Sequence, residues 1–152
     1  MDVPVRLSND VRAALYGEHK LGAVGCKHLI GIFLGTGIGG AIIIDGKLYL
    51  GATGHAGNIG HYLLQPLGPL AGSDRGGQLD TIASRAAIAG EAAALATKRK
   101  APHLLDSVGT DVKKITSTAL ADAIEQGDAD VEELVRNRAG YLASSFQTWW
   151  TS

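Results

Sequence analysis

The sequence predicts an α/β protein, because a β-rich segment in its first third is followed by long stretches with helical patterns. Residues 28–50 combine branched and aromatic side chains with glycine-rich turns, which is typical of consecutive strands. Residues 79–98 are rich in alanine and carry apolar side chains at helical spacing. A chain of 152 residues has the size of one domain and can bury a hydrophobic core.

The first elements that we expect are a short strand and a helix. Residues 3–7 are β-prone, and Ser8 or Asn9 can cap a helix that runs from Val11 to about Leu21. Gly22 and Gly25 are expected to end this helix, because glycine readily adopts the backbone conformation found after a helix C-terminus.

The β-rich segment predicts three strands, over residues 28–34, 41–44 and 47–50. Asp45-Gly46, between the second and third strands, is typical of a two-residue hairpin turn. The first two strands are joined by the glycine-rich segment Gly35 to Gly40, which reads Gly-Thr-Gly-Ile-Gly-Gly.

The rest of the chain predicts a long loop and then helices. Residues 51–73 lack clear periodicity, and a loop of this length in a compact domain is usually functional. We expect one continuous helix over residues 79–98 and a shorter one from Ser117 to near residue 127. Asp128 or Asp130 is expected to cap a last helix, with an apolar side formed by Leu134, Val135, Leu142, Phe146 and Trp149.

Composition excludes several classes of function. The formal net charge of -1 and the lack of a long basic run argue against contact with nucleic acid. The longest uncharged run, residues 29–44, is interrupted by glycines and is shorter than a membrane span. We therefore expect no contact with a membrane. A single cysteine, Cys26, cannot form an internal disulfide, so we expect a cytoplasmic protein.

The glycine-rich segment is a candidate phosphate site. Glycines let the backbone approach a ligand closely, and successive N–H groups in such a turn bind anions. Thr36 adds a hydroxyl donor. A glycine-rich hairpin without a ligand fits these residues equally well. The segment is neither a Walker loop nor a Rossmann turn, because it lacks Gly-Lys-Ser/Thr and is followed by a strand.

Two other polar clusters are candidates for chemistry. Asn9-Asp10 lies at a helix start, where Asp10 is either part of the cap or a base that accepts a hydroxyl proton in phosphoryl transfer. Asn58 and His61 lie three residues apart in the long loop and could both contact a polar ligand. A structural role is the alternative for both of them.

Four motifs, taken in chain order, closely resemble the ROK family. They are Asn-Asp, Leu-Gly-Thr-Gly-Ile-Gly-Gly, Asp-Gly-Lys-Leu-Tyr-Leu-Gly and Gly-Asn-Ile-Gly-His. That family contains bacterial sugar kinases and sugar-responsive repressors on the actin-like ATPase (ribonuclease H-like) fold. The resemblance runs from Val5 to Ile88 and continues loosely to Ser145. It implies that residues 1–8 are the end of the N-terminal lobe and residues 9–152 most of the C-terminal lobe.

The resemblance implies a role for each matching residue. Asp10 corresponds to the catalytic base, and Asn9 beside it to a sugar ligand. Gly35, Thr36 and Gly37 correspond to the second phosphate motif, which faces the phosphates of ATP with Mg²⁺. His61 corresponds to a residue that contacts sugar hydroxyls and, in many members, zinc. The resemblance also implies a homodimer for the full-length protein.

Three departures from the family pattern affect these roles. Asn58 replaces a usual glutamate, so a sugar hydroxyl would lose a charge-assisted hydrogen bond. Asp80 replaces a sugar-binding glutamate and is shorter by one methylene. The three cysteines of the zinc motif are missing from residues 71–80, and His61 alone cannot hold a structural zinc ion. We therefore predict no zinc; Asp74 and Arg75 are candidates to order this loop instead.

The resemblance also implies that the chain is part of a larger protein. Full members begin with an Asp-x-Gly-Gly-Thr phosphate loop and end with a glycine-rich adenosine motif, and neither is present. The leading interpretation is a segment of an ATP-dependent kinase for a hexose such as glucose, or for an amino sugar, with negligible activity on its own. The alternatives are the sugar-binding domain of a NagC-like transcriptional regulator, or a divergent product with only a structural role.

Overall fold

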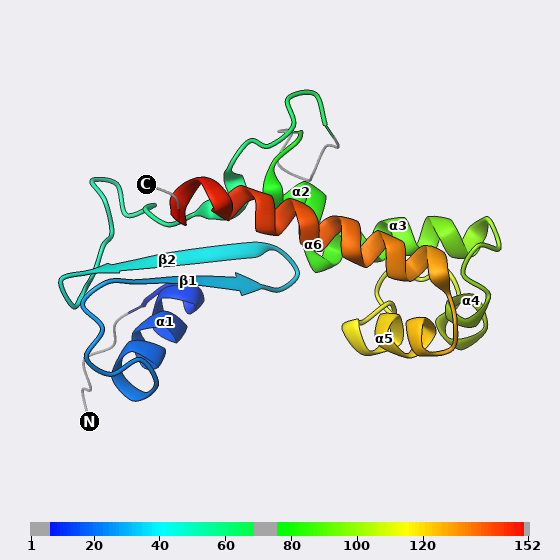
Figure 1. Ribbon diagram of the computed structural model, residues 1–152, viewed down its shortest axis with the longest axis horizontal. Coiled ribbons are helices and arrows are strands. Elements are labelled where there is room, and N and C mark those ends of the chain that lie inside the picture. Colours follow the sequence, from blue (N-terminus) through cyan, green and yellow to red (C-terminus); the bar gives the residue numbers. More distant parts are fainter. Residues whose placement is uncertain (1–6, 69–75, 151–152) are drawn as a thin grey trace. The chain divides into compact units, whose positions relative to one another are not determined.

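The computed structural model describes residues 7–68 and 76–150, with backbone only for residues 148–150. The chain forms two compact units, one of residues 1–33 and 39–60 and the other of residues 34–38 and 61–152 (Figure 1). The strand expected over residues 3–7 lies almost wholly outside the described residues.

The first unit packs helix α1 (Asp10–Leu21) against a sheet (Figure 1). The sheet has the order β1 (Leu29–Leu34), β2 (Ile38–Ile44), β3 (Lys47–Leu48). The predicted cap is confirmed, since the Asn9 side-chain oxygen accepts a hydrogen bond from the Arg12 N–H at 3.3 Å. Gly22 follows the helix as its C-cap, as expected, but with φ of −105°, and it is Gly25 that has positive φ, 89°.

Two glycines of the sheet make room for α1. A Cβ at Gly31 would lie 2.6 Å from a methyl carbon of Leu15, and one at Gly39 would lie 2.5 Å from a methyl carbon of Val11. The expected start of the second strand at Ala41 is wrong, because β2 begins at Ile38 and includes Gly39 and Gly40. Gly39 is needed for helix packing, and the turn itself is limited to residues 35–37.

The hairpin turn at Asp45-Gly46 is confirmed. Both residues have positive φ, 50° and 73°, as a type I′ turn requires. Ile44 pairs with Lys47 and Ile43 with Leu48. Strand β3 is shorter than the expected 47–50, because Leu50 accepts a hydrogen bond from Ala56 and the chain bends away at Gly51, where φ is 67°.

The second unit is helical. Its elements are α2 (Leu79–Ala83), α3 (Arg85–Thr97), α4 (Pro102–Val108), α5 (Ser117–Glu125) and α6 (Ala129–Trp150). The expectation of one continuous helix over residues 79–98 is wrong. Ser84 adopts extended backbone angles (φ −71°, ψ 161°), and its hydroxyl accepts a hydrogen bond from the Ala87 N–H, so it ends α2 and caps α3.

Helix α4 is missed by the sequence interpretation, although Pro102 at its first position is a start signal. Its cap comes from a distant residue. The Asp128 carboxylate accepts hydrogen bonds from the His103 N–H at 3.2 Å and the Leu104 N–H at 2.9 Å. Asp128 directly precedes α6, as expected of its cap, and its carbonyl accepts the Glu132 N–H at 3.1 Å, but its buried carboxylate caps α4 instead of α6. Asp130 lies inside α6.

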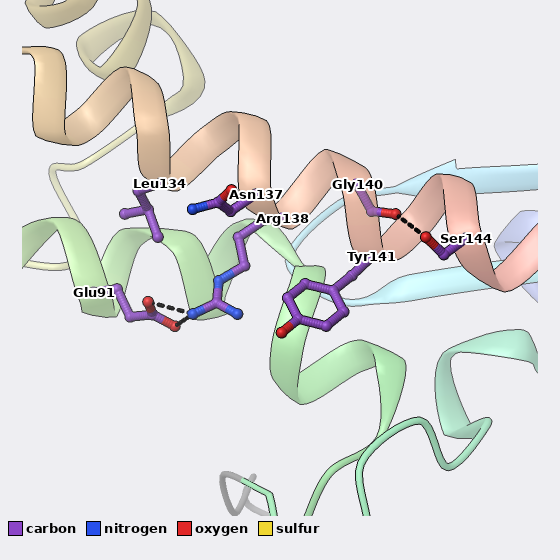
Figure 2. Close-up of a pocket in the computed structure, with 7 residues that line it drawn as sticks. All are labelled: Glu91, Leu134, Asn137, Arg138, Gly140, Tyr141 and Ser144. Atoms are coloured by element: carbon purple, nitrogen blue, oxygen red, sulfur yellow. Dashed lines mark hydrogen bonds and ion pairs between the residues drawn. The ribbon is translucent and has the colours of Figure 1, made fainter.

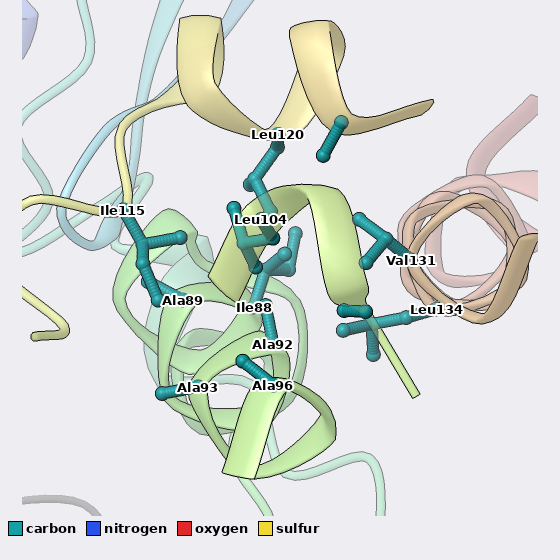
Figure 3. Close-up of a cluster of buried hydrophobic side chains, with 12 residues drawn as sticks. Ile88, Ala89, Ala92, Ala93, Ala96, Leu104, Ile115, Leu120, Val131 and Leu134 are labelled. Atoms are coloured by element: carbon teal, nitrogen blue, oxygen red, sulfur yellow. The ribbon is translucent and has the colours of Figure 1, made fainter. Parts of the chain in front are cut away.

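Helices α3 to α6 share one apolar core, which Figure 3 shows around α3. The small alanine side chains of α3 let α4 and α6 pack against it. The buried members are Ile88, Ala89, Ala92, Ala93, Ala96, Ala101, Leu104, Ile115, Leu120, Ala123, Val131 and Leu134. On the expected apolar side of α6, Leu134 is buried and Val135 packs against the core, whereas the side chain of Trp149 is not described.

Candidate functional site

The turn after β1 is anchored to the start of helix α3. The carbonyl oxygens of Gly35 and Thr36 accept hydrogen bonds from the Arg85 N–H at 3.1 Å and the Ala86 N–H at 3.3 Å. The first N–H groups of a helix lack acceptors within the helix, and the two carbonyl groups of the turn serve as acceptors for two of these N–H groups. This arrangement fixes the direction in which the carbonyl groups of the turn point.

The N–H groups of the turn divide into two pairs. The Gly35 N–H donates to the Gly37 carbonyl at 2.8 Å, and the Ile38 N–H donates to the Asp80 carboxylate. Among the described residues, the N–H groups of Thr36 and Gly37 have no protein acceptor. Two adjacent free N–H groups in a turn form an anion-binding concavity. The phosphate interpretation of Gly35, Thr36 and Gly37 stays a prediction, for which these two N–H groups are the available donors.

Asp80, in the first turn of α2, lies against this turn. Its Oδ1 accepts the Ile38 N–H, and a Cβ at Gly37 would lie 2.9 Å from Oδ1 and 3.1 Å from Oδ2. A side chain at position 37 would therefore require the Asp80 carboxylate to move. The sequence predicts Asp80 as a sugar ligand; the structure gives it a partner in the turn and leaves Oδ2 without a protein hydrogen bond among the described residues.

Arg85 is a residue that sequence reasoning missed. Its guanidinium donates a hydrogen bond to the Thr36 hydroxyl at 2.8 Å. No carboxylate of the described residues lies within ion-pair distance of it. The available signal was its place at the first position of α3, where a cation is disfavoured by the helix dipole and therefore needs a reason.

His61 ends the short 3-10 helix η1 (Ile59–His61). Its Nδ1 lies 3.1 Å from the side-chain oxygen of the buried Gln78, so Nδ1 is the donor and Nε2 is left for a ligand. The Leu79 N–H donates to the Tyr62 carbonyl at 2.9 Å, which ties this segment to the start of α2.

The prediction of no zinc concerns the loop at residues 71–80, of which the structure describes residues 76–80. Within residues 7–68 and 76–150, no three His, Cys, Asp or Glu side chains cluster in a way that could hold a metal ion. Asp74 and Arg75, the expected loop-ordering pair, lie outside the described residues. Elemental analysis of the purified protein tests this prediction, and stoichiometric zinc would contradict it.

Asn9, Asp10 and Asn58 belong to the first unit and are all exposed. The Asn9 oxygen caps α1, which leaves its amide NH₂ to face a ligand. One carboxylate oxygen of Asp10 accepts the Val11 N–H at 2.8 Å. The Arg12 guanidinium donates to the Gly54 carbonyl and so ties the loop that carries Asn58 to the start of α1.

A close backbone contact holds the same loop against β2. A Cβ at Gly40 would overlap the Gly57 carbonyl oxygen, and one at Gly57 would lie 2.9 Å from the Ala41 Cα. Gly57 also has φ of 86°, which favours glycine. Gly40, at the end of the glycine-rich segment, therefore positions the loop before Asn58 and has no part in the turn.

A separate pocket of about 560 Å³ lies between α3 and α6 (Figure 2). Arg138 donates to both carboxylate oxygens of Glu91 at 2.5 Å, and its guanidinium lies 5.6 Å from the centre of the Tyr141 ring. None of the predicted site residues lines it. The ion pair joins two helices of the second unit.

No helix in the described parts of the chain is both long and apolar enough to cross a membrane.

Comparison with known proteins assigns the chain to a protein family. The model of the ROK family matches residues 1–151. An N-acetylmannosamine kinase from Escherichia coli O157:H7 is 33% identical over 142 residues, which are 93% of this chain and 43% of the relative. The chain thus spans less than half the length of this relative.

Two solved structures share the fold. A ROK family glucokinase from Streptomyces griseus, in complex with glucose and AMPPNP, superposes with a TM-score of 0.77 at 35% identity, over 96% of this chain and 49% of that one. A ROK family transcriptional regulator, a homologue of the E. coli MLC protein, has a TM-score of 0.67 at 23% identity, over 91% of this chain and 34% of the regulator. The expected resemblance and fold are confirmed, and this chain belongs to the ROK family, with its actin-like ATPase fold.

Proposed function

We propose that this chain is a segment of a ROK sugar kinase that holds the phosphates of ATP and part of a hexose or amino sugar. The observation that carries the proposal is the turn at residues 35–37, where the N–H groups of Thr36 and Gly37 are free to bind an anion. Its relatives include an N-acetylmannosamine kinase and a glucokinase bound to an ATP analogue, which supports the same substrate classes here.

In the proposed reaction, a sugar hydroxyl oxygen forms a bond to the γ-phosphorus of ATP while the bond to the β-phosphate oxygen breaks. Asp10 would accept the hydroxyl proton, and its exposed carboxylate supports this role. Mg²⁺ bound to the phosphates would neutralise developing charge. A protein-bound Mg²⁺ ion keeps several water ligands and needs only one or two carboxylate ligands. The Asp80 carboxylate, which lies against the turn, would fit as one of these carboxylate ligands.

On the sugar side we propose Asn9, Asn58 and His61. An amide offers both a donor and an acceptor, as does a sugar hydroxyl. The His61 ring, with Nδ1 held by Gln78, would accept a hydroxyl proton at Nε2 in a hydrogen bond. Asn58 remains uncharged where an acidic residue would bind more strongly, so we expect weak sugar binding by this chain.

Asn9→Asp separates helix capping from sugar binding. Aspartate keeps the oxygen that caps α1 but loses the amide donor. We expect the affinity for sugar to fall about tenfold, as for loss of one hydrogen bond in a polar site, with an unchanged melting temperature. Calorimetry with glucose and N-acetylmannosamine measures this, and Asn137→Asp on α6 is the matched control.

The outcome decides between two roles for Asn9. A loss of affinity confined to Asn9→Asp supports the proposed sugar site. Equal affinity of wild type and Asn9→Asp would leave Asn9 as a helix cap only. If no sugar binds the wild type, the proposed sugar side of the function is wrong.

Phosphoryl transfer distinguishes a kinase from a regulator. The regulator superposes on this chain, but at 23% identity this shows the fold alone. We expect the 152-residue chain by itself to phosphorylate sugars negligibly, and the full-length protein to transfer phosphate from ATP to a hexose or amino sugar. A full-length protein that binds sugar without transferring phosphate would favour the regulator.

A further inference from the structure

Arg85 is a cation in a place that ordinarily disfavours one. It occupies the first position of the 13-residue helix α3, at the positive end of the helix dipole. Arg136 and Arg138 of the same unit each pair with a glutamate. Arg85 instead donates to the uncharged Thr36 hydroxyl, and no described carboxylate pairs with it. Its charge therefore has no ion-pair partner within 4.0 Å among the described residues.

The hydrogen bond to Thr36 also directs the threonine hydroxyl. Because Oγ1 accepts from the guanidinium at 2.8 Å, the hydroxyl proton is available to another acceptor. Thr36 thus offers its hydroxyl proton and its N–H, and Gly37 offers a second N–H. The guanidinium has five N–H donors, of which this bond uses one.

The Asp80 carboxylate places a negative charge beside the turn. It is bonded to the Ile38 N–H and lies against Gly37, so a phosphate in the turn would be near a like charge. A fixed cation on the Thr36 side offsets this repulsion. Arginine suits the role because its planar fork can contact a neighbour and a phosphate oxygen together.

We propose that Arg85 is a phosphate-binding residue of the turn, which holds Thr36 in place and contacts a phosphate oxygen of the nucleotide directly. This inference rests on the proposed function of the turn and adds a ligand to it. If Arg85 only held Thr36, its replacements would act through the loss of that contact, and glutamine and lysine would weaken anion binding to the same extent.

The test is calorimetric titration of the chain with inorganic pyrophosphate at several salt concentrations. Arg85→Gln retains a donor for Thr36 but loses the charge, and Arg85→Lys retains the charge. We expect Arg85→Gln to weaken binding about tenfold, as for loss of a charged hydrogen bond, and to reduce its salt dependence. We expect Arg85→Lys to weaken it less, and the matched charge change Arg136→Gln to leave it unchanged.

The outcomes separate the inference from the function beneath it. Wild-type binding that Arg85→Gln leaves unchanged overturns the role of Arg85 and leaves the phosphate turn standing. Equal weakening by Arg85→Gln and Arg85→Lys, with unchanged salt dependence, shows a structural residue and also overturns it. Failure of the wild type to bind pyrophosphate contradicts the phosphate turn itself. Circular dichroism melting confirms that each variant is folded.

Discussion

Gly77→Ala is expected to lower the free energy of unfolding by about 3 kcal/mol, because a left-handed backbone and an overlap with neighbouring backbone both add cost. Gly77 has φ of 73°. A Cβ there would overlap the Gln65 carbonyl oxygen and lie 2.6 Å from its carbonyl carbon. The Gly77 carbonyl also accepts hydrogen bonds from the N–H groups of Leu64 and Gln65, at 3.0 Å each. Neither backbone segment can move away without breaking these bonds.

Gly46→Ala is the matched control for this prediction. Gly46, in the hairpin turn, has the same φ, 73°, but nothing lies within 4 Å of a Cβ placed there. We expect a loss of about 1 kcal/mol from the left-handed conformation alone. Chemical denaturation measures both variants. Equal losses would contradict the close approach of residue 77 to Gln65, which positions Gln78 next to His61.

Asp128→Ala is expected to cost about 2–3 kcal/mol of stability, because it removes a helix cap and leaves buried N–H groups unpaired. Asp128 is 2% exposed, and its carboxylate accepts hydrogen bonds from the N–H groups of His103 and Leu104 at the start of α4. The Leu104 side chain belongs to the apolar core, so loss of the cap loosens a helix that the core requires.

Two variants control the Asp128 prediction. Asp128→Asn keeps one acceptor oxygen and is expected to lose less than Asp128→Ala. Asp130→Ala, two residues later, removes only a surface pair with Lys100 at 3.4 Å and is expected to change stability by less than about 1 kcal/mol. Thermal and urea unfolding measure these differences. An Asp130→Ala loss as large as that of Asp128→Ala would contradict the assigned cap.

The strands and the first helix were predictable because their signals are local. The Asn9 cap, the Asp45-Gly46 turn and the branched residues of β1 and β2 act within a few residues of one another. The break at Ser84 was not predictable in the same way, since the alanine pattern continues across it. Helix α4 is capped from Asp128, 24 residues beyond Leu104, which no local pattern reveals.

The candidate site was predictable only in part. The glycines at 35–40 look alike in the sequence, but Gly39 accommodates Val11 and Gly40 accommodates Gly57. These are tertiary contacts, and only residues 35–37 form the turn. Arg85 was missed because its partner Thr36 lies 49 residues away. The roles of Asp10, Asn58 and His61 follow from the family resemblance and stay predictions.

The central claim is that the turn at residues 35–37 binds phosphate through two free N–H groups, and an amide NMR titration with pyrophosphate tests it most directly. Gly35 and Ile38 serve as internal comparisons, because their N–H groups are already bonded within the protein. We predict saturable shifts that are largest at Thr36 and Gly37 and small at Gly35 and Ile38. Shifts that leave Thr36 and Gly37 unmoved, with binding elsewhere or not at all, would contradict the account.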